Sequence, residues 1–305
     1  MDFLSAIKSI AGEECIFCNE MMSDHTTFKV GGPAKYFVVP YRAEDIKKYI
    51  LAAEEYKIPY YVIGNGSNLL VSDKGYDGMI IMLGRDLGNI TVNGDRITAE
   101  AGTSLARLFN TARRHSLSGL EFAAGIPGTL GGACYMNAGA YGGEMKDVLT
   151  KVVTIDRQGN THEYKQGEME LSYRNSIFIR KQEIILSAEM KLCKGDVEKM
   201  TNKVNELLEK RKEKQPLEYP SAGSTFKRPE GDFAGRLIEE CGLKGKGVNG
   251  AEVSKKHAGF IINRNNATAR DIYDTINLVT DTVLKKTGIK LEPEVRLLGD
   301  FSGNT

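Results

Sequence analysis

Three short segments carry polar groups whose types suit acid–base chemistry on an acidic substrate. Arg174 lies within 172–178 (SYRNSIF), Ser224 lies within 219–229 (YPSAGSTFKRP), and Glu294 lies close to the end of the chain. An arginine can bind a carboxylate in two places, a hydroxyl can donate a proton, and a carboxylate can adjust both. Together they suit the reduction of an acidic substrate beside a redox cofactor.

Each of these residues also has a purely structural interpretation when it is taken singly. Arg174 could be a surface ion-pair partner, and Ser224 could be a turn residue. Glu292 and Glu294 share one face of an expected terminal strand, about 6.6 Å apart at two residues along it, and their geometry does not choose between them. Strand alternation places the apolar residues of this segment on the opposite face: Leu291, Pro293, Val295 and Leu297.

Two glycine-containing segments strengthen the functional interpretation. In 121–143, seven of the chain's 33 glycines alternate with apolar anchors such as Ile126 and Leu130, which indicates a packed backbone rather than a linker. In 62–70 (VIGNGSNLL), an apolar strand runs into a second polar glycine turn. Bare backbone that can adopt positive φ and present N–H donors suits a diphosphate. Two such loops predict a large dinucleotide held from two sides, although the shorter one could be an ordinary tight turn.

The common nucleotide fingerprints do not fit. Gly64-x-Gly66 lacks the third glycine of G-x-G-x-x-G, and no G-x-x-x-x-G-K-[ST] occurs. A Rossmann or P-loop site is therefore disfavoured.

Composition narrows the class of protein. The 305 residues carry 41 Lys plus Arg against 40 Asp plus Glu, so the net charge of +1 favours neither nucleic acid nor an anionic membrane as a partner. Five scattered cysteines and no long apolar run indicate reduced thiols and a cytoplasmic protein. Cys15 and Cys18 form a CxxC without a second pair, so we expect no metal and place both on a small N-terminal helix.

The hydrophobic pattern predicts a mixed α and β chain in three parts: an N-terminal helical segment (1–20), a first domain (21–195) and a smaller α/β domain (196–305). Strand, helix and strand are expected over 34–64, an Asn93-Gly94 hairpin follows, and Ser104 should cap a helix to about His115. The helix over 196–216 should bury a stripe of apolar residues: Val197, Met200, Val204, Leu207 and Leu208.

At this point the motifs resemble a known family. HTTFKVGGPA (25–34), the two glycine segments, SYRNSIF, SAGSTFKRP and LEPEVRLLG follow the order and spacing of the UDP-N-acetylmuramate dehydrogenases over roughly residues 20 to 300. The resemblance implies an α+β architecture: an FAD-binding domain of the p-cresol methylhydroxylase and vanillyl-alcohol oxidase type, followed by a substrate-binding domain. The chain resembles the shorter subclass, which lacks a loop carrying a substrate-covering tyrosine.

The resemblance also implies roles for residues. Arg174, Ser224 and Glu294 match the catalytic trio, and Tyr173, Lys227 and Arg228 are the expected substrate contacts. FAD would be held by the two glycine segments at Gly64, Asn65, Gly66, Ser67, Asn68, Gly125, Gly128, Thr129, Gly131, Gly132, Ala133, Asn137, Ala138 and Gly139.

The implied reaction belongs to peptidoglycan precursor synthesis: NADPH reduces FAD, and the reduced cofactor transfers hydride to the vinyl carbon of UDP-N-acetylglucosamine enolpyruvate. We therefore expect a small-molecule substrate, no nucleic-acid or membrane partner, and a monomer or weak oligomer. Two alternatives from other classes are an FAD-dependent alcohol or sugar oxidase of the same fold group, and a nucleotide-sugar binding protein without turnover.

Overall fold

The computed structural model describes residues 2–303, which form two compact units built from discontinuous segments. Among the described residues, unit 1 comprises 2–17, Tyr36–Asn65 and Gly78–Lys210, and unit 2 comprises Cys18–Lys35, Gly66–Asp77 and 211–303. Each unit has its own apolar core. Within residues 2–303, no helix is long and apolar enough to cross a membrane.

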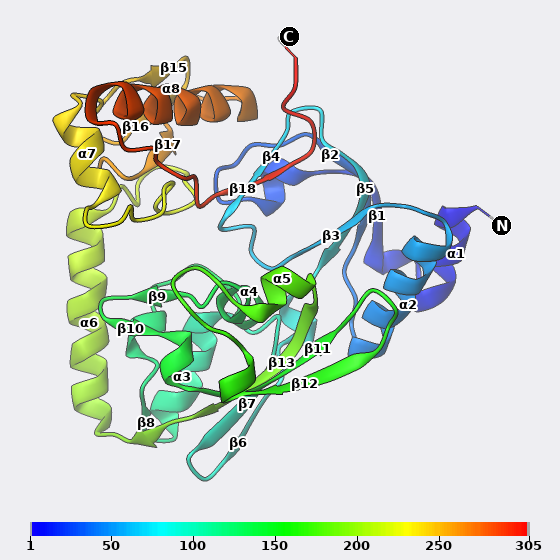
Figure 1. Cartoon of the computed structure of the whole chain (residues 1–305). Coiled ribbons are helices and arrows are strands. Elements are labelled where there is room, and N and C mark those ends of the chain that lie inside the picture. The colour runs from blue at the N-terminus through cyan, green and yellow to red at the C-terminus, as the bar shows by residue number, and fades with distance from the viewer. Residues whose placement is uncertain (1, 304–305) are drawn as a thin grey trace. The chain divides into compact units, whose positions relative to one another are not determined.

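A five-stranded antiparallel sheet is the largest feature of unit 1, visible at the lower part of Figure 1. Its order is β12-β11-β13-β7-β6, with bounds Thr161–Lys165, Leu149–Ile155, Ile184–Lys191, Arg96–Glu100 and Ile90–Asn93. The Asn93-Gly94 hairpin is confirmed: Asn93 pairs with Arg96, and Gly94 has a φ of 60°, which primed turns require. Short pairs β9–β10 (Gly139–Ala140 and Gly143–Glu144) and β8–β14 (Leu117–Ser118 and Cys193–Lys194) complete this region.

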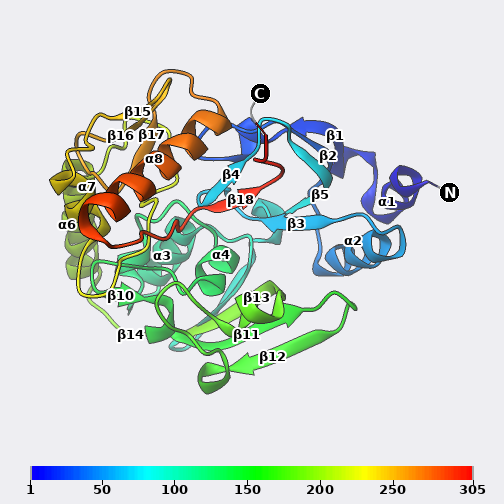
Figure 2. The same ribbon diagram turned by 45° about the horizontal axis from the view of Figure 1, so that its top comes forward.

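The second sheet has the order β1-β2-β5-β3, with bounds Ile16–Met21, Pro33–Val38, Tyr76–Met82 and Tyr60–Ile63. β3 and β5 pair in parallel. A parallel pair needs a crossover connection, and residues 64–75 provide it. Helices α1 (Phe3–Ala11) and α2 (Ala43–Glu55) pack beside each other (Figure 2). α2 buries Ile46, Tyr49, Ile50 and Ala53 on one face, as its 3.6-residue pattern predicts.

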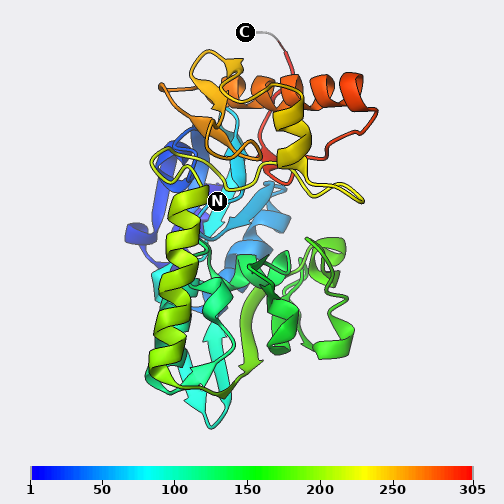
Figure 3. The ribbon, with the colours of Figure 1, turned by 90° about the vertical axis from the view of Figure 1, so that its left-hand side faces the viewer.

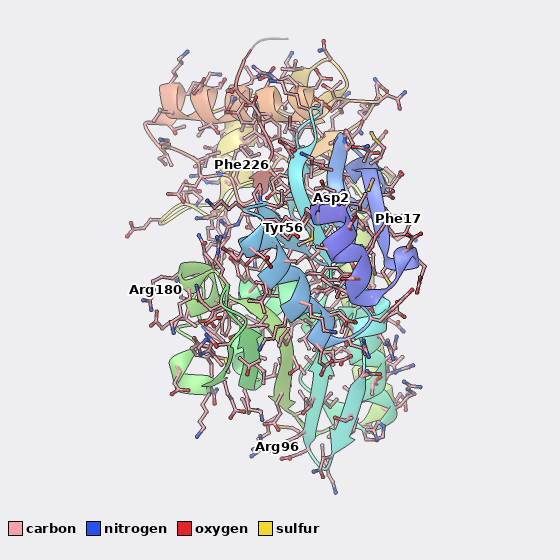
Figure 4. All side chains as sticks on the ribbon, turned by 90° about the vertical axis from the view of Figure 1, so that its right-hand side faces the viewer. Asp2, Phe17, Tyr56, Arg96, Arg180 and Phe226 are labelled. Atoms are coloured by element: carbon pink, nitrogen blue, oxygen red, sulfur yellow. The ribbon has the colours of Figure 1, made fainter. Side chains whose placement is uncertain are left out.

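Helix α3 (Leu105–Arg114) and helix α4 (Leu130–Tyr135) belong to unit 1. The predicted cap of α3 is confirmed, since the Ser104 hydroxyl accepts a hydrogen bond from the Arg107 N–H at 3.3 Å. α4 packs against β13 and β7 of the five-stranded sheet. A five-residue helix, α5 (Ile177–Lys181), follows the Arg174 segment, and Figure 4 shows its Arg180 projecting outward.

Unit 2 contains helices α7 (Ala234–Glu240) and α8 (Ala269–Thr287) and a three-stranded antiparallel sheet, β15-β16-β17, with bounds Gly247–Val248, Ala251–Val253 and Ile261–Asn263. α8 packs against all three strands (Figure 3). It begins with a capping box between Thr268 and Asp271 and ends at Gly288, whose φ is 75°. Strand β18 (Arg296–Leu298) pairs in parallel with β4 (Leu69–Val71).

The long helix α6 (Val197–Lys214) is continuous in Figure 3 and ends two residues before Pro216, close to the predicted range of 196–216. Its buried stripe is narrower than expected. Met200, Val204 and Leu207 are buried, but Val197 is 44% exposed and Leu208 is 42% exposed. At 100° per residue these two lie about 50–75° from the centre of the stripe, beyond its edge.

Two further expectations are wrong. Cys15 and Cys18 do not lie on the first α-helix: Cys15 closes a 3-10 turn (Glu13–Cys15), and Cys18 lies in β1. The alternation expected over 291–297 also fails, because only Arg296–Leu298 is a regular strand and Leu297 is exposed while Leu291 and Val295 are buried. A side-chain period of two does not continue through irregular backbone.

Candidate functional site

The two predicted glycine loops lie against each other in unit 1. A Cβ on Gly64, which follows β3, would sit 2.2 Å from the Thr129 hydroxyl oxygen, so only glycine fits there. The Asn65 side-chain amide donates to the Pro127 carbonyl at 3.2 Å. The convergence that two loops around one dinucleotide require is therefore present at Gly64 and Asn65.

Helix α4 places Gly131 and Gly132 differently from each other. A Cβ on Gly131 would meet the Ala101 Cβ at 2.9 Å, whereas a Cβ on Gly132 would meet only the Thr129 hydroxyl, at 3.8 Å. Gly131 thus allows α4 to pack on the end of β7, whereas Gly132 is exposed and has room for a side chain.

The expected use of positive φ in this segment is wrong for most positions. Within the described chain, Gly142 is the one glycine of 125–143 with a positive φ, 89°. The others permit close approach instead. The helix start is also less available to an anion than expected, because the N–H groups of Leu130 and Gly131 already donate to the carbonyls of Thr103 and Ala101, at 2.8 and 2.9 Å.

At the end of α4, the groups available to contact a cofactor are backbone groups and not side chains. Ala133 and Ala138 are buried, and the Ala138 N–H donates to the Ala133 carbonyl at 2.8 Å. A Cβ on Gly139 would meet the Glu144 Cβ at 2.8 Å. Asn137 has a left-handed φ of 46°, and its side-chain amide is bonded within the protein. Any cofactor contact at Asn137 would therefore use its backbone.

The rest of the GNGSN turn belongs to unit 2. Gly66 has a φ of 58°, and its Cβ would lie 2.0 Å from the His25 carbonyl oxygen, so glycine is required. Its carbonyl accepts from the Thr27 N–H at 3.3 Å. Ser67 is half-buried. The Asn68 side chain, expected at the cofactor, donates to the Glu294 carbonyl at 3.2 Å and so connects this turn to a catalytic candidate.

Arg174 occupies the tip of a two-residue turn in unit 1. Ser172 and Asn175 exchange backbone hydrogen bonds at 3.2 and 3.1 Å, which closes the turn around Tyr173 and Arg174. Arg174 has a φ of 53°, a conformation that costs a non-glycine residue on the order of 1 kcal/mol and that concentrates at functional sites. Its guanidinium carbon lies 5.4 Å from the centre of the exposed Tyr173 ring.

Ser224 and Glu294 are linked in unit 2 through Thr225, which follows Ser224 in the chain and is hydrogen-bonded to Glu294. The Thr225 carbonyl accepts from the Glu294 N–H at 2.7 Å, and Thr225 itself is fully buried. Its N–H donates to the Gly259 carbonyl at 2.8 Å, and its hydroxyl accepts from the Ile261 N–H at 3.1 Å. Ser224 is exposed beside this anchored backbone.

The remaining candidates have visible partners. Lys227 forms an ion pair with Glu292 at 3.0 Å, and the Glu292 side chain is 70% exposed. The Arg228 guanidinium carbon lies 4.6 Å from the centre of the exposed Phe233 ring.

His257 is half-buried and stacks edge-on against Phe260, and its Nδ1 accepts from the Gly259 N–H at 3.1 Å. Burial lowers the pKa of His257. These contacts are those of a structural histidine.

Sequence reasoning missed two anchoring residues, Thr225 and Ser176. The Ser176 hydroxyl is buried and donates to the Tyr135 carbonyl at 2.5 Å. Thr225 directly follows the predicted Ser224, and Ser176 lies two residues after the predicted Arg174, so closeness in the chain to a predicted site residue was the one signal available.

The unit 1 loops are suited to FAD, because a large cofactor needs backbone that it can approach closely. Gly64 and Gly131 leave no room for side chains, and Gly132 leaves space where a ligand can lie.

Comparison with known proteins gives two matches to family models. Residues 34–165 match the model described as an FAD binding domain, and residues 215–298 match the model of the C-terminal domain of UDP-N-acetylenolpyruvoylglucosamine reductase. The grass pollen allergen Phl p 4, whose structure is described as having glucose dehydrogenase activity, aligns with a TM-score of 0.51 at 14% identity over 64% of this chain and 45% of its own. That likeness shows a shared fold only.

Full-length relatives are much closer. UDP-N-acetylenolpyruvoylglucosamine reductase of Syntrophomonas wolfei is 51% identical over 94% of this chain and 96% of its own. The protein of the same name in Caldanaerobacter subterraneus is 49% identical over 96% and 97%. The crystal structure of the reductase from Thermus caldophilus superposes with a TM-score of 0.79 at 36% identity, covering 92% of this chain and 98% of its own. With this identity along nearly its whole length, the chain belongs to the UDP-N-acetylenolpyruvoylglucosamine reductase family.

Proposed function

We propose that this chain uses NADPH to reduce the enolpyruvyl group of UDP-N-acetylglucosamine enolpyruvate, which yields UDP-N-acetylmuramate for peptidoglycan precursor synthesis. One observation carries the proposal beyond family membership. The turn that presents Arg174 is bonded to the end of α4, the same segment that belongs to the candidate FAD loops. A carboxylate-binding group is therefore built onto the cofactor region.

When bound, FAD would supply the redox chemistry that relays hydride from NADPH to the vinyl carbon of the substrate. Arg174 has the role of binding the substrate carboxylate and stabilising the negative charge that develops next to it. A planar guanidinium can do so with two parallel hydrogen bonds.

Ser224 has the role of donating the proton to the carbon that becomes carbanionic. Its exposed hydroxyl stands on backbone that Thr225 fixes from three directions. Glu294, bonded through its N–H to the Thr225 carbonyl, would assist that transfer.

Differences in contacts and exposure support a choice between the two glutamates. Glu292 is engaged by Lys227 in an exposed ion pair, whereas Glu294 is less exposed and its backbone is held on both sides, by Thr225 and by Asn68. We propose Glu294 as the functional carboxylate. Tyr173, Lys227 and Arg228 adjoin these groups in the chain and remain the proposed substrate contacts.

The rival oxidase function rests on a fold that both classes share, and family membership favours the reductase. We further propose a cytoplasmic location, because the substrate and NADPH are cytoplasmic metabolites and the five cysteines are unpaired. A monomer or weak oligomer, and a domain boundary near residue 195, remain part of the proposal.

The test is a product assay. The purified protein should consume NADPH and form UDP-N-acetylmuramate, identified by mass, in equal amounts, and only when UDP-N-acetylglucosamine enolpyruvate is present. NADPH consumption with oxygen or with simple alcohols, and none with the enolpyruvyl nucleotide, would support the oxidase.

A further inference from the structure

The turn that presents Arg174 is tied to the end of α4 at both of its sides. On the side before Arg174, the Asn137 Nδ2 donates to the Ser172 carbonyl at 3.1 Å. On the side after it, the Ser176 hydroxyl donates to the Tyr135 carbonyl at 2.5 Å. All of these groups belong to unit 1.

Asn137 is built for this contact. Its side chain is 1% exposed, and an amide has two donor hydrogens. One goes to Ser172 and the other to the Glu144 carboxylate at 2.7 Å, while Oδ1 accepts from the Lys146 N–H at 2.9 Å. Glu144 and Lys146 thus fix the amide, and its remaining N–H donates to the Arg174 turn.

Ser176 is equally buried and stands just before α5. The Ser172–Asn175 backbone pair closes the two-residue turn that carries the left-handed Arg174, and the two anchors tie the closed turn to the end of α4. A misplacement of about 1 Å in a group that orients a substrate can cost on the order of 10²-fold in rate.

We propose that Asn137 and Ser176 are positioning residues that hold the Arg174 turn in register with the substrate carboxylate. Asn137 therefore acts through Ser172 and Arg174, and its side chain is not a cofactor ligand. The kinetic part of this inference rests on the proposed function, whereas the structural part does not.

The structural part is tested by amide hydrogen exchange on flavin-free protein. Ser176→Ala removes one hydroxyl, and Asn137→Gly removes the amide while glycine tolerates the φ of 46°. Each variant loses one hydrogen bond to the turn and should speed exchange about 10-fold in peptides covering 170–178, with peptides of β11 unchanged. Gln182→Gly is the matched control, because Gln182 is also left-handed but its side chain is exposed.

The kinetic part is tested by separating the two half-reactions of the FAD-loaded protein. Ser176→Ala should leave flavin reduction by NADPH unchanged and slow reoxidation by the enolpyruvyl nucleotide by on the order of 10-fold to 10²-fold. In an Arg174→Ala background the same change should add little, because the group that it positions is already gone. Gln182→Gly should leave both half-reactions as they are.

Three results would overturn the proposal: unchanged exchange over 170–178 in both variants, equal slowing of both half-reactions, or full additivity with Arg174→Ala. A wild-type protein that does not react with the enolpyruvyl nucleotide would refute the proposed function, yet the exchange result would still decide whether the anchors hold the turn.

Discussion

At the scale of single residues, the candidate site contains backbone conformations that side chains normally avoid. Arg174 and Asn137 are both left-handed non-glycine residues, with φ of 53° and 46°. Such positions persist only when surrounding contacts determine them, and they are concentrated where geometry serves function. Sequence motifs identified both residues, but no propensity indicates that an arginine will adopt this conformation, because local sterics disfavour it.

Arg174→Lys should not behave as a conservative change. A lysine is a point charge and cannot form two parallel hydrogen bonds to a carboxylate, so we expect turnover to fall by on the order of 10²-fold or more. Steady-state turnover measures the effect. Arg180→Lys is the control, since Arg180 is exposed and pairs with Glu170. Near-normal turnover of Arg174→Lys would return Arg174 to a surface role.

Ser224→Ala should affect one half of the cycle. Reduction of FAD by NADPH needs no proton on a substrate carbon and should keep its rate. Reoxidation by the enolpyruvyl nucleotide should slow by roughly 10²-fold to 10⁴-fold, the usual contribution of a positioned general acid. Stopped-flow absorbance of the flavin band separates the halves. Equal slowing of both would make Ser224 a structural or binding residue.

The glutamates provide a matched pair. Glu294→Gln should slow reoxidation of the flavin, because the proposed assisting carboxylate is lost. Glu292→Gln breaks an exposed ion pair with Lys227, whose contribution is at most about 1 kcal/mol, and should leave the rate nearly unchanged. A reversed ranking in the same stopped-flow assay would assign the role to Glu292.

At the scale of elements, most helices and strands could be predicted because their patterns are local. α2, α3, the β6–β7 hairpin and α8 follow from hydrophobic period, caps and turn residues. The failures depend on contacts distant in sequence. The segment before β18 is held irregularly by residues 225–227, which no period in 290–299 reveals. Likewise, Gly131 and Gly132 lie in a helix because carbonyls of the 101–103 loop accept hydrogen bonds from the first N–H groups of α4.

Those two glycines allow a test of the cofactor loop. Gly132→Val should give a folded protein, because glycine is already a poor helix former and its replacement does not weaken the helix. The protein should lack yellow colour, because the added side chain fills the space beside Thr129. Gly131→Ala should instead lower the stability of the flavin-free protein, by about 1–3 kcal/mol, because its Cβ would press on Ala101. Flavin absorbance and thermal unfolding of the apo-protein give the two readouts. Full flavin occupancy in Gly132→Val would place the cofactor elsewhere.

At the scale of the whole molecule, the proposed catalytic trio is divided between the units: Arg174 belongs to unit 1, and Ser224 and Glu294 belong to unit 2. The chain passes between the units several times. The matched family models cover one stretch on either side of the proposed boundary near residue 195. Sequence motifs could identify the members of the site, whereas their assignment to units depends on pairing between distant segments such as β4 and β18.

FAD should be held without a covalent bond, because the loops offer backbone and small residues. Acid precipitation should release all of the yellow colour into the supernatant, which absorbance measures. Colour that remains in the pellet would indicate a covalent link and would revive the oxidase alternative.

The central claim is that electrons pass from NADPH through FAD to an enolpyruvyl sugar nucleotide. Anaerobic absorbance titration of the flavin tests it most directly. We predict that stoichiometric NADPH bleaches the flavin band, and that stoichiometric UDP-N-acetylglucosamine enolpyruvate then restores it while UDP-N-acetylglucosamine does not. A band that stays bleached after the enolpyruvyl nucleotide is added, and returns only when oxygen is admitted, would contradict the account.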